Sequence, residues 1–201
     1  MSYDFKAISL SYKNASLSIR ETVALSTEQS GKLLIMLRDF LDLQEALVVS
    51  TCNRTEVYYS SEKNLGEEIV KLISIAKSDE NIKSAFGNFT QYDDNTEAVN
   101  HLYRVAIGLE SQVVGDLQIT GQLKNAYQAS ADAGMAGMFL HRLMHSIFFT
   151  NKRVVQESNF RDGAASIAYA AVELIDELTL SNRNAIVLVL GLGEIGVGNR
   201  R

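Results

Sequence analysis

Residues 46–60 read ALVVSTCNRTEVYYS, and this stretch contains two runs that are rich in residues favoured by β-strands. The first run is Ala46–Ser50 and the second is Thr55–Ser60, both dominated by β-branched, aromatic and other apolar side chains. Cys52, Asn53 and Arg54 lie between them, and Cys52 is the single cysteine of the 201-residue chain. We therefore expect two consecutive strands that are connected at this cysteine.

The segments around these two strands predict a small α/β (α+β) domain. A capping box, Ser26 with Gln29 three residues later, marks the start of one helix. In chain order, the expected elements are a strand at 3–12, a helix from 26 to about 42, the strands at 46–50 and 55–60, a helix at 65–76, a helical turn at 82–86 and a strand at 88–92. The order β-α-β-β-α-β predicts a ferredoxin-like split-βαβ sandwich of roughly 90 residues.

Long helices are expected after residue 95, and the last part of the chain has a different character. The helices are expected at about 96–109, 117–133, 138–157 and 164–178. The apolar run 185–190 then precedes Gly191-Leu192-Gly193-Glu194-Ile195-Gly196, which fits the glycine fingerprint of a Rossmann dinucleotide-binding domain. That fingerprint also needs a following helix, a second strand and a ribose reader, and only five residues follow. We expect a catalytic domain at 1–160, and a linker helix with a truncated Rossmann start at 161–201.

Composition limits the class of protein. The chain carries a net charge of −5, lacks an apolar run long enough to cross a membrane, and begins without a signal-peptide pattern. A single cysteine permits no internal disulfide. We expect a soluble, cytoplasmic protein that is not generally basic, although the helix carrying His141, Arg142, His145, Lys152 and Arg153 has a local basic bias. That bias fits either a solvated face or contact with RNA phosphates.

Two interpretations of Cys52 are open from the residues alone. A lone cysteine commonly serves as a small buried apolar side chain. Cys52, however, follows a strand end and has the polar neighbours Thr51, Asn53 and Arg54. Arg54 can favour the reactive thiolate or hold a substrate carboxylate, so Cys52 is equally a candidate nucleophile.

Two widely separated segments resemble the glutamyl-tRNA reductase family. Residues 50–56 read STCNRTE and residues 108–122 read GLESQVVGDLQITGQ. The resemblance continues in the same order through Lys152-Arg153-Val154, GAASIA at 163–168 and GLGEIG at 191–196. Two departures are Ser11–Ser16, which reads SYKNAS where the family has NHKTAP, and Leu117, which replaces a proline. We expect these changes to affect fine specificity and rate.

The resemblance implies NADPH-dependent reduction of glutamyl-tRNA(Glu) to glutamate 1-semialdehyde, the first step of the five-carbon route to tetrapyrroles. It implies that Cys52 is the nucleophile that forms a glutamyl thioester and that His101 assists catalysis. The positions implied for substrate binding are Thr51, Asn53, Arg54, Ser111, Asp116, Leu117, Gln118 and Gln122. The positions implied for NADPH are Gly191, Leu192, Gly193, Glu194, Ile195 and Gly196.

The resemblance also implies a homodimer for the full-length protein and glutamate-1-semialdehyde aminomutase as a partner. The truncated Rossmann start predicts that this chain retains thioester or esterase chemistry without being competent as a reductase alone. A non-catalytic tRNA-binding or regulatory module is the alternative. His141 and His145 lie four residues apart, but no third ligand accompanies them, so we expect no metal site.

Overall fold

A computed structural model describes residues 4–116, 118–158, 160, 167–180, 186 and 188. It contains a four-stranded antiparallel sheet in the order β2-β3-β1-β4. The strands are β1 (Phe5–Ser11), β2 (Ala46–Ser50), β3 (Arg54–Ser60) and β4 (Thr90–Tyr92). This arrangement confirms the mixed α/β class and the two strands expected on either side of Cys52.

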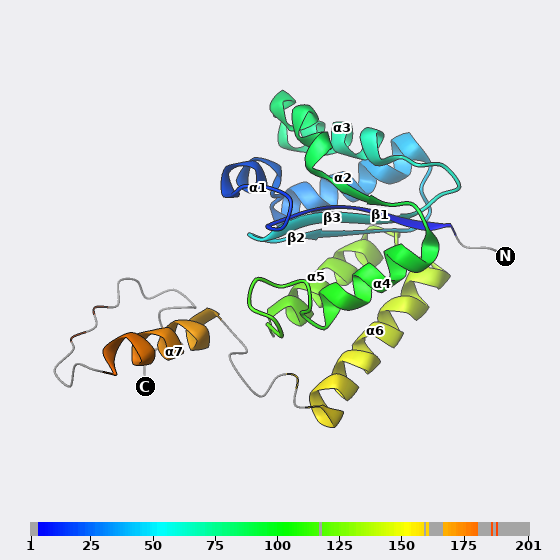
Figure 1. Ribbon diagram of the computed structural model, residues 1–201. Helices are drawn as coiled ribbons and strands as arrows, with labels where there is room; N and C mark the ends of the chain where they lie inside the picture. Colours follow the sequence, from blue (N-terminus) through cyan, green and yellow to red (C-terminus); the bar gives the residue numbers. More distant parts are fainter. Residues whose placement is uncertain are drawn as a thin grey trace.

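Helices cover both faces of this sheet (Figure 1). The elements α1 (Leu17–Val23), α2 (Thr27–Leu41), α3 (Gly66–Lys77) and the 3₁₀ helix η1 (Glu80–Asn88) accompany one face. The elements α4 (Asn95–Ala106), α5 (Gln118–Asp132) and α6 (Met138–Glu157) accompany the other face. A further helix, α7 (Ile167–Thr179), lies later in the chain. None of the helices in the described residues is both long enough and apolar enough to cross a membrane.

The two faces of the sheet form two separate apolar cores because side chains alternate along each strand. Ile8, Val57 and Tyr59 belong to the core on the α2–α3 side. Ala7 and Tyr58, their neighbours in sequence, belong to the core on the α4–α6 side. The register pairs Ser9 of β1 with Glu56 of β3. Ser9 is two positions from Ala7 and Glu56 is two positions from Tyr58, so both point to the α4–α6 side. Two polar residues therefore enter the face that α4–α6 cover.

Local sequence patterns predicted most of the helices at the positions where the structure has them. The capping box at α2 is present, since the Gln29 N–H donates to Ser26 Oγ at 3.1 Å and the Ser26 N–H donates to Gln29 Oε1 at 2.9 Å. The sequence did not predict α1, a seven-residue helix in which only Val23 is buried, because so short an element shows no apolar stripe.

The helix expected at 96–109 ends earlier, at Ala106. Gly108 then adopts a φ of 85°, a conformation that a helix excludes. The expected helical turn at 82–86 is longer, at 80–88, and the strand expected at 88–92 is shorter, at 90–92.

Candidate active site

Cys52 lies at the tip of the hairpin between β2 and β3. The Thr51 N–H donates to the Arg54 carbonyl at 2.8 Å, which leaves Cys52 and Asn53 as a two-residue loop. The Asn53 carbonyl accepts the Tyr12 N–H at 3.0 Å, so the segment after β1 braces the hairpin. The Cys52 side chain is exposed. This position rules out the interpretation of Cys52 as a buried apolar filler and leaves its thiol open to a substrate.

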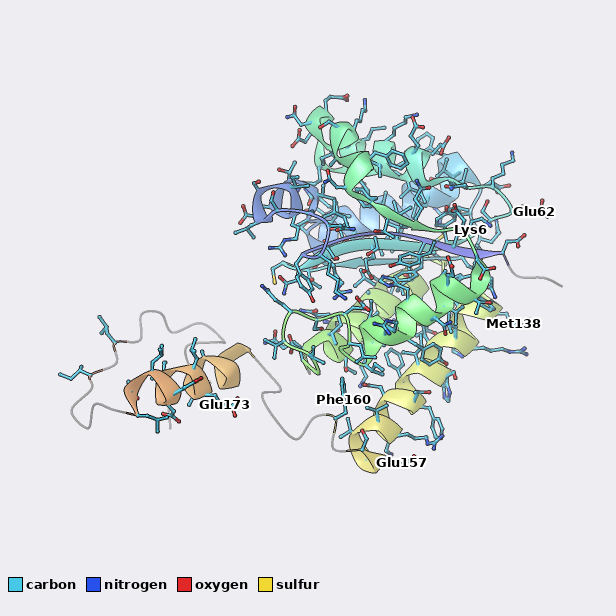
Figure 2. The ribbon with its side chains drawn as sticks, in the orientation of Figure 1. Lys6, Glu62, Met138, Glu157, Phe160 and Glu173 are labelled. Atoms are coloured by element: carbon cyan, nitrogen blue, oxygen red, sulfur yellow. The ribbon has the colours of Figure 1, made fainter. Side chains whose placement is uncertain are left out.

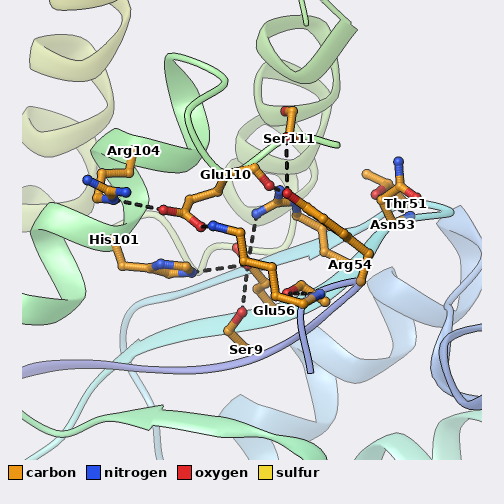
Figure 3. A network of polar contacts seen from close by, with 12 residues as sticks. Ser9, Thr51, Asn53, Arg54, Glu56, His101, Arg104, Glu110 and Ser111 are labelled. Atoms are coloured by element: carbon orange, nitrogen blue, oxygen red, sulfur yellow. Dashed lines mark hydrogen bonds and ion pairs between the residues drawn. The ribbon is translucent and has the colours of Figure 1, made fainter. Parts of the chain in front are cut away.

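Arg54 points into the protein from the first position of β3. Its Nη1 lies 3.1 Å from Glu56 Oε1, and its Nη2 donates to the Glu110 carbonyl oxygen. The Arg54 side chain is only 2% exposed. The sequence suggested that Arg54 acts on the thiol or on a substrate carboxylate. In the structure its guanidinium joins β3 to the loop that carries Glu110 (Figure 3).

Glu56 is the centre of a buried polar network. Its Oε1 accepts a hydrogen bond from Ser9 Oγ at 2.7 Å and lies 3.1 Å from His101 Nε2, and its Oε2 accepts from the Tyr58 hydroxyl at 2.7 Å. Burial alone would raise the pKa of Glu56, but the Arg54 charge and the hydrogen bonds from His101 and Tyr58 outweigh burial and lower that pKa to about 2. Glu56 is therefore a buried anion at neutral pH.

The same network changes the acidity of Tyr58. Burial and the neighbouring Glu56 carboxylate raise the pKa of the Tyr58 hydroxyl well above its ordinary value. This hydroxyl therefore remains a hydrogen-bond donor to Glu56 throughout the neutral range.

His101 projects from α4 and is held on two sides. Its Nε2 faces Glu56, and its ring stacks on the Tyr92 ring with centroids 4.3 Å apart and planes 17° apart. The His101 side chain is 9% exposed. The structure thus places the predicted His101 in the Glu56 network, where a fixed ring orientation suits a group that handles a proton or a developing charge.

A tight loop between α4 and α5 carries Ser111 toward the hairpin. Gly108 and Gly115 both have positive φ, 85° and 88°, and the Gly115 N–H donates to the Gly108 carbonyl at 3.0 Å. A Cβ on Gly108 would lie 3.0 Å from Gly115 Cα, so the close approach needs glycine. Tyr12 Oη donates to the Ser111 carbonyl at 3.1 Å, which links this loop to the end of β1.

Glu110 fixes the same loop through two cations. Its carboxylate pairs with Lys13 and accepts from Arg104 Nε at 2.7 Å. Burial opposes ionisation of Glu110, yet the hydrogen bonds from Lys13 and Arg104 lower its pKa below the ordinary value. The loop is therefore attached to the segment after β1, to α4 and, through Arg54, to β3.

The remaining predicted positions are distributed more widely. Asp116 Oδ1 accepts the Gln118 N–H at 2.9 Å, at the first turn of α5, so Asp116 stabilises that helix end. Gln122 lines a separate pocket of about 180 Å³ together with Ser50 and Thr27, and none of the network residues lines that pocket. Leu117 and Gly191–Gly196 lie outside the described residues.

Sequence patterns alone did not single out four residues of the site, which are Glu56, Tyr58, Tyr92 and Glu110. The sequence did contain a signal for Glu56. Glu56 and Tyr58 lie two positions apart on the strand expected at 55–60, so their side chains point to the same face of the sheet, and a large aromatic residue there indicates a buried face. An acid at such a position needs buried partners. No group of three or more histidine, cysteine, aspartate or glutamate side chains in the described part of the chain is arranged to hold a metal ion.

Comparison with known proteins identifies the family. The family described as "Glutamyl-tRNAGlu reductase, N-terminal domain" matches residues 8–158. A glutamyl-tRNA reductase of Cytophaga hutchinsonii is 53% identical over 193 residues, which cover 96% of this chain and 45% of the relative. A second relative, from Aquifex aeolicus, is 37% identical over 188 residues and is also covered to 45%.

The solved glutamyl-tRNA reductase from Methanopyrus kandleri superposes with a TM-score of 0.70 at 30% identity, over 98% of this chain and 45% of that structure. The chain thus spans about half the length of these relatives. The STCNRTE hairpin, the loop after α4 and the arrangement of the sheet all lie in the matched region, so the chain belongs to the glutamyl-tRNA reductase family and carries its N-terminal domain.

Proposed function

We propose that this chain carries the part of a glutamyl-tRNA reductase that takes glutamate from glutamyl-tRNA(Glu) onto Cys52. The reaction would begin the five-carbon route to tetrapyrroles and would yield glutamate 1-semialdehyde. The observation that supports this most directly is the exposed Cys52 thiol on a two-residue hairpin loop, directly before a buried network of fixed charges. The proposed domains follow from the same assignment. Residues 1–160 would form the catalytic domain, and residues 161–201 would form the linker helix and the start of the NADPH domain. The strand order supports assigning the sheet to the ferredoxin-like split-βαβ arrangement.

The first chemical step is a transesterification. The Cys52 thiolate attacks the carbonyl carbon of the ester between glutamate and the tRNA ribose. A carbon–sulfur bond forms, the bond from that carbon to the ribose oxygen breaks, and the departing ribose oxygen takes up a proton. A thiolate is an effective nucleophile for acyl groups, and the thioester product accepts hydride more readily than the ester. The thioester then requires a hydride donor, which we propose is NADPH, although the stretch expected to bind it, Gly191–Gly196, lies outside the described residues.

The network has a positioning role in this proposal. Arg54 and Glu56 hold the base of the Cys52 hairpin against the loop that carries Ser111, because Arg54 contacts both Glu56 and the Glu110 carbonyl. Thr51, Asn53 and Ser111 would then surround the glutamyl group. The other positions proposed for substrate binding are Asp116, Leu117, Gln118 and Gln122. His101, fixed by Glu56 and Tyr92, would supply a proton or polarise the carbonyl. Homodimerisation and contact with the aminomutase remain predictions for the full-length protein.

Trapping of the thioester tests this function. The chain would be incubated with glutamyl-tRNA(Glu) that carries labelled glutamate, then quenched in acid, and protein-bound label would be counted before and after neutral hydroxylamine. We expect hydroxylamine-labile label on the wild type and none on Cys52→Ala. The control is Thr22→Ala, which removes a half-buried hydroxyl that donates to the Ser18 carbonyl within α1, and it should label like the wild type.

Equal label on the wild type and Cys52→Ala would overturn the role of Cys52. Binding of tRNA by the wild type without any covalent label would favour the alternative, a non-catalytic tRNA-binding module.

A further inference from the structure

The outer face of α6 is basic in a chain that is acidic overall. No aspartate or glutamate occurs between residues 133 and 156, although the whole chain carries a net charge of −5. One face of α6 presents a set of exposed residues at positions three or four apart, which we name the α6 stripe. The α6 stripe consists of His141, Arg142, His145, Ser146, Phe149 and Lys152.

Within the part of the chain that the structure describes, Arg142 and Lys152 of the α6 stripe have no acidic partner in an ion pair. Arg153 is satisfied within the helix, since its Nη2 lies 2.7 Å from Glu157 Oε2. The ion pairs of the described residues include neither Arg142 nor Lys152. Two exposed cations on the same helix are therefore available to an external anion.

The surface is hollowed and includes an exposed aromatic ring. His141, Arg142, His145, Ser146 and Phe149 line an open depression of about 470 Å³. Phe149 is 60% exposed, so its ring is accessible at this surface. Cations beside an exposed ring suit RNA, because phosphates pair with the cations and unpaired bases stack on aromatic side chains.

The position of α6 relates the α6 stripe to the proposed active site. Helices α4, α5 and α6 lie on the side of the sheet that the Glu56 network faces, whereas α1–α3 lie on the other side (Figure 1). Figure 2 labels the two ends of α6. Met138 lies at the end near the sheet, and Glu157 lies at the end farther from it. The α6 stripe therefore belongs to the helical layer on the side of the sheet that the Glu56 network faces.

We propose that the α6 stripe binds the sugar–phosphate backbone of glutamyl-tRNA, with Arg142 and Lys152 pairing with phosphates and Phe149 stacking on a base. This inference rests on the proposed function for the identity of the RNA. It does not depend on the chemistry at Cys52.

Charge reversal on two faces tests the proposal. The probe is uncharged tRNA(Glu), and binding is followed by fluorescence anisotropy from about 50 to 200 mM salt. Arg142→Glu/Lys152→Glu changes the α6 stripe, and Lys32→Glu/Lys63→Glu makes the same charge change at exposed positions outside it. The 201-residue chain is used throughout, and thermal unfolding midpoints verify that both double variants fold.

We expect the stripe variant to bind at least about tenfold more weakly than the wild type at 100 mM salt and the control variant to bind nearly as the wild type. The slope of log affinity against log salt should fall by about 2 for Arg142→Ala/Lys152→Ala, since each phosphate contact contributes close to one unit. Phe149→Ala should weaken binding with little change in this slope.

Three results would overturn the proposal. They are equal weakening by the stripe and control variants, an unchanged salt slope, or stripe-dependent binding to phosphatidylserine vesicles without binding to tRNA. The thioester assay, run on the same proteins, separates this result from the proposed function. Loss of label with intact tRNA binding contradicts the function alone, whereas label on Cys52 together with stripe-independent binding contradicts the α6 stripe alone.

Discussion

Arg54 and Glu56 form a fully buried ion pair two residues apart on the same strand. The distance from Arg54 Nη1 to Glu56 Oε1 is 3.1 Å, and the two side chains are 2% and 0% exposed. Such a pair is costly to break, because the remaining partner is left as an uncompensated buried charge. Around it, contacts from Ser9, Tyr58, His101 and the Glu110 carbonyl complete the network. The hairpin that presents Cys52 is therefore anchored at Arg54 by a buried polar network.

Replacement of Glu56 by glutamine should destabilise the chain strongly. Glu56→Gln keeps the shape of the side chain but removes the charge that compensates Arg54, so we expect a loss of about 3 kcal/mol in the free energy of unfolding. Urea denaturation measures this loss. The matched control is Glu157→Gln, which breaks an exposed pair with Arg153 and should cost less than about 1 kcal/mol. Losses of similar size in the two variants would contradict the role of burial.

The stability of the chain should fall in acid because of Glu56. Its pKa in the folded state, about 2, lies below its ordinary value of 4.5, so the unfolded chain binds this proton more readily. The stabilisation is therefore complete above about pH 5 and is lost as the pH falls toward 2. The loss amounts to about 3 kcal/mol for this group. Urea denaturation between pH 6 and pH 2 measures it.

Direct titration separates Glu56 from the other acids. Carbon-13 NMR of the Glu56 carboxyl should show ionisation persisting far below pH 4. A Glu56 carboxyl that titrates near 4.5 would contradict the compensation by Arg54, His101 and Tyr58.

Removal of the Tyr58 hydroxyl should weaken the network without leaving a cavity. Tyr58→Phe deletes a 2.7 Å hydrogen bond to the buried Glu56 carboxylate, and bonds to charged groups contribute about 1.5–3 kcal/mol. We expect an unfolding free energy lower by that amount and a higher Glu56 pKa. Tyr103→Phe removes an exposed bond to Ser146 and should change stability by less than about 0.5 kcal/mol. A larger effect at Tyr103 than at Tyr58 would refute this ranking.

Substitution of Gly108 should disturb the loop that carries Ser111. Gly108→Ala forces an alanine to a φ of 85° and places its Cβ 3.0 Å from Gly115 Cα, so we expect a loss of more than about 1 kcal/mol and less glutamate bound to Cys52. Gly121→Ala, within α5 and with open space around the new Cβ, should instead stabilise the chain by about 0.5–1 kcal/mol. Chemical denaturation and the labelling assay measure both effects. Normal labelling by a folded Gly108→Ala protein would show that this loop geometry is dispensable.

Local patterns in the sequence determined the strands beside Cys52, the capped start of α2 and most other helices. These features depend on interactions between residues a few positions apart, such as the Ser26–Gln29 capping box. The family resemblance also rests on linear motifs, and the comparisons confirm it. Where local patterns were weak, as in the seven residues of α1, the sequence did not predict the element.

Only the tertiary structure decided how the site is built. The partners of Glu56 come from Ser9, Arg54, Tyr58 and His101, which are brought together by the β1–β3 register and by the docking of α4 on the sheet. The sequence identified Arg54 and His101 as functional candidates but gave no indication that both converge on one buried carboxylate. Hydrogen bonds and ion pairs depend on distances of about 3 Å, and such distances between residues far apart in sequence are fixed only when the chain has folded.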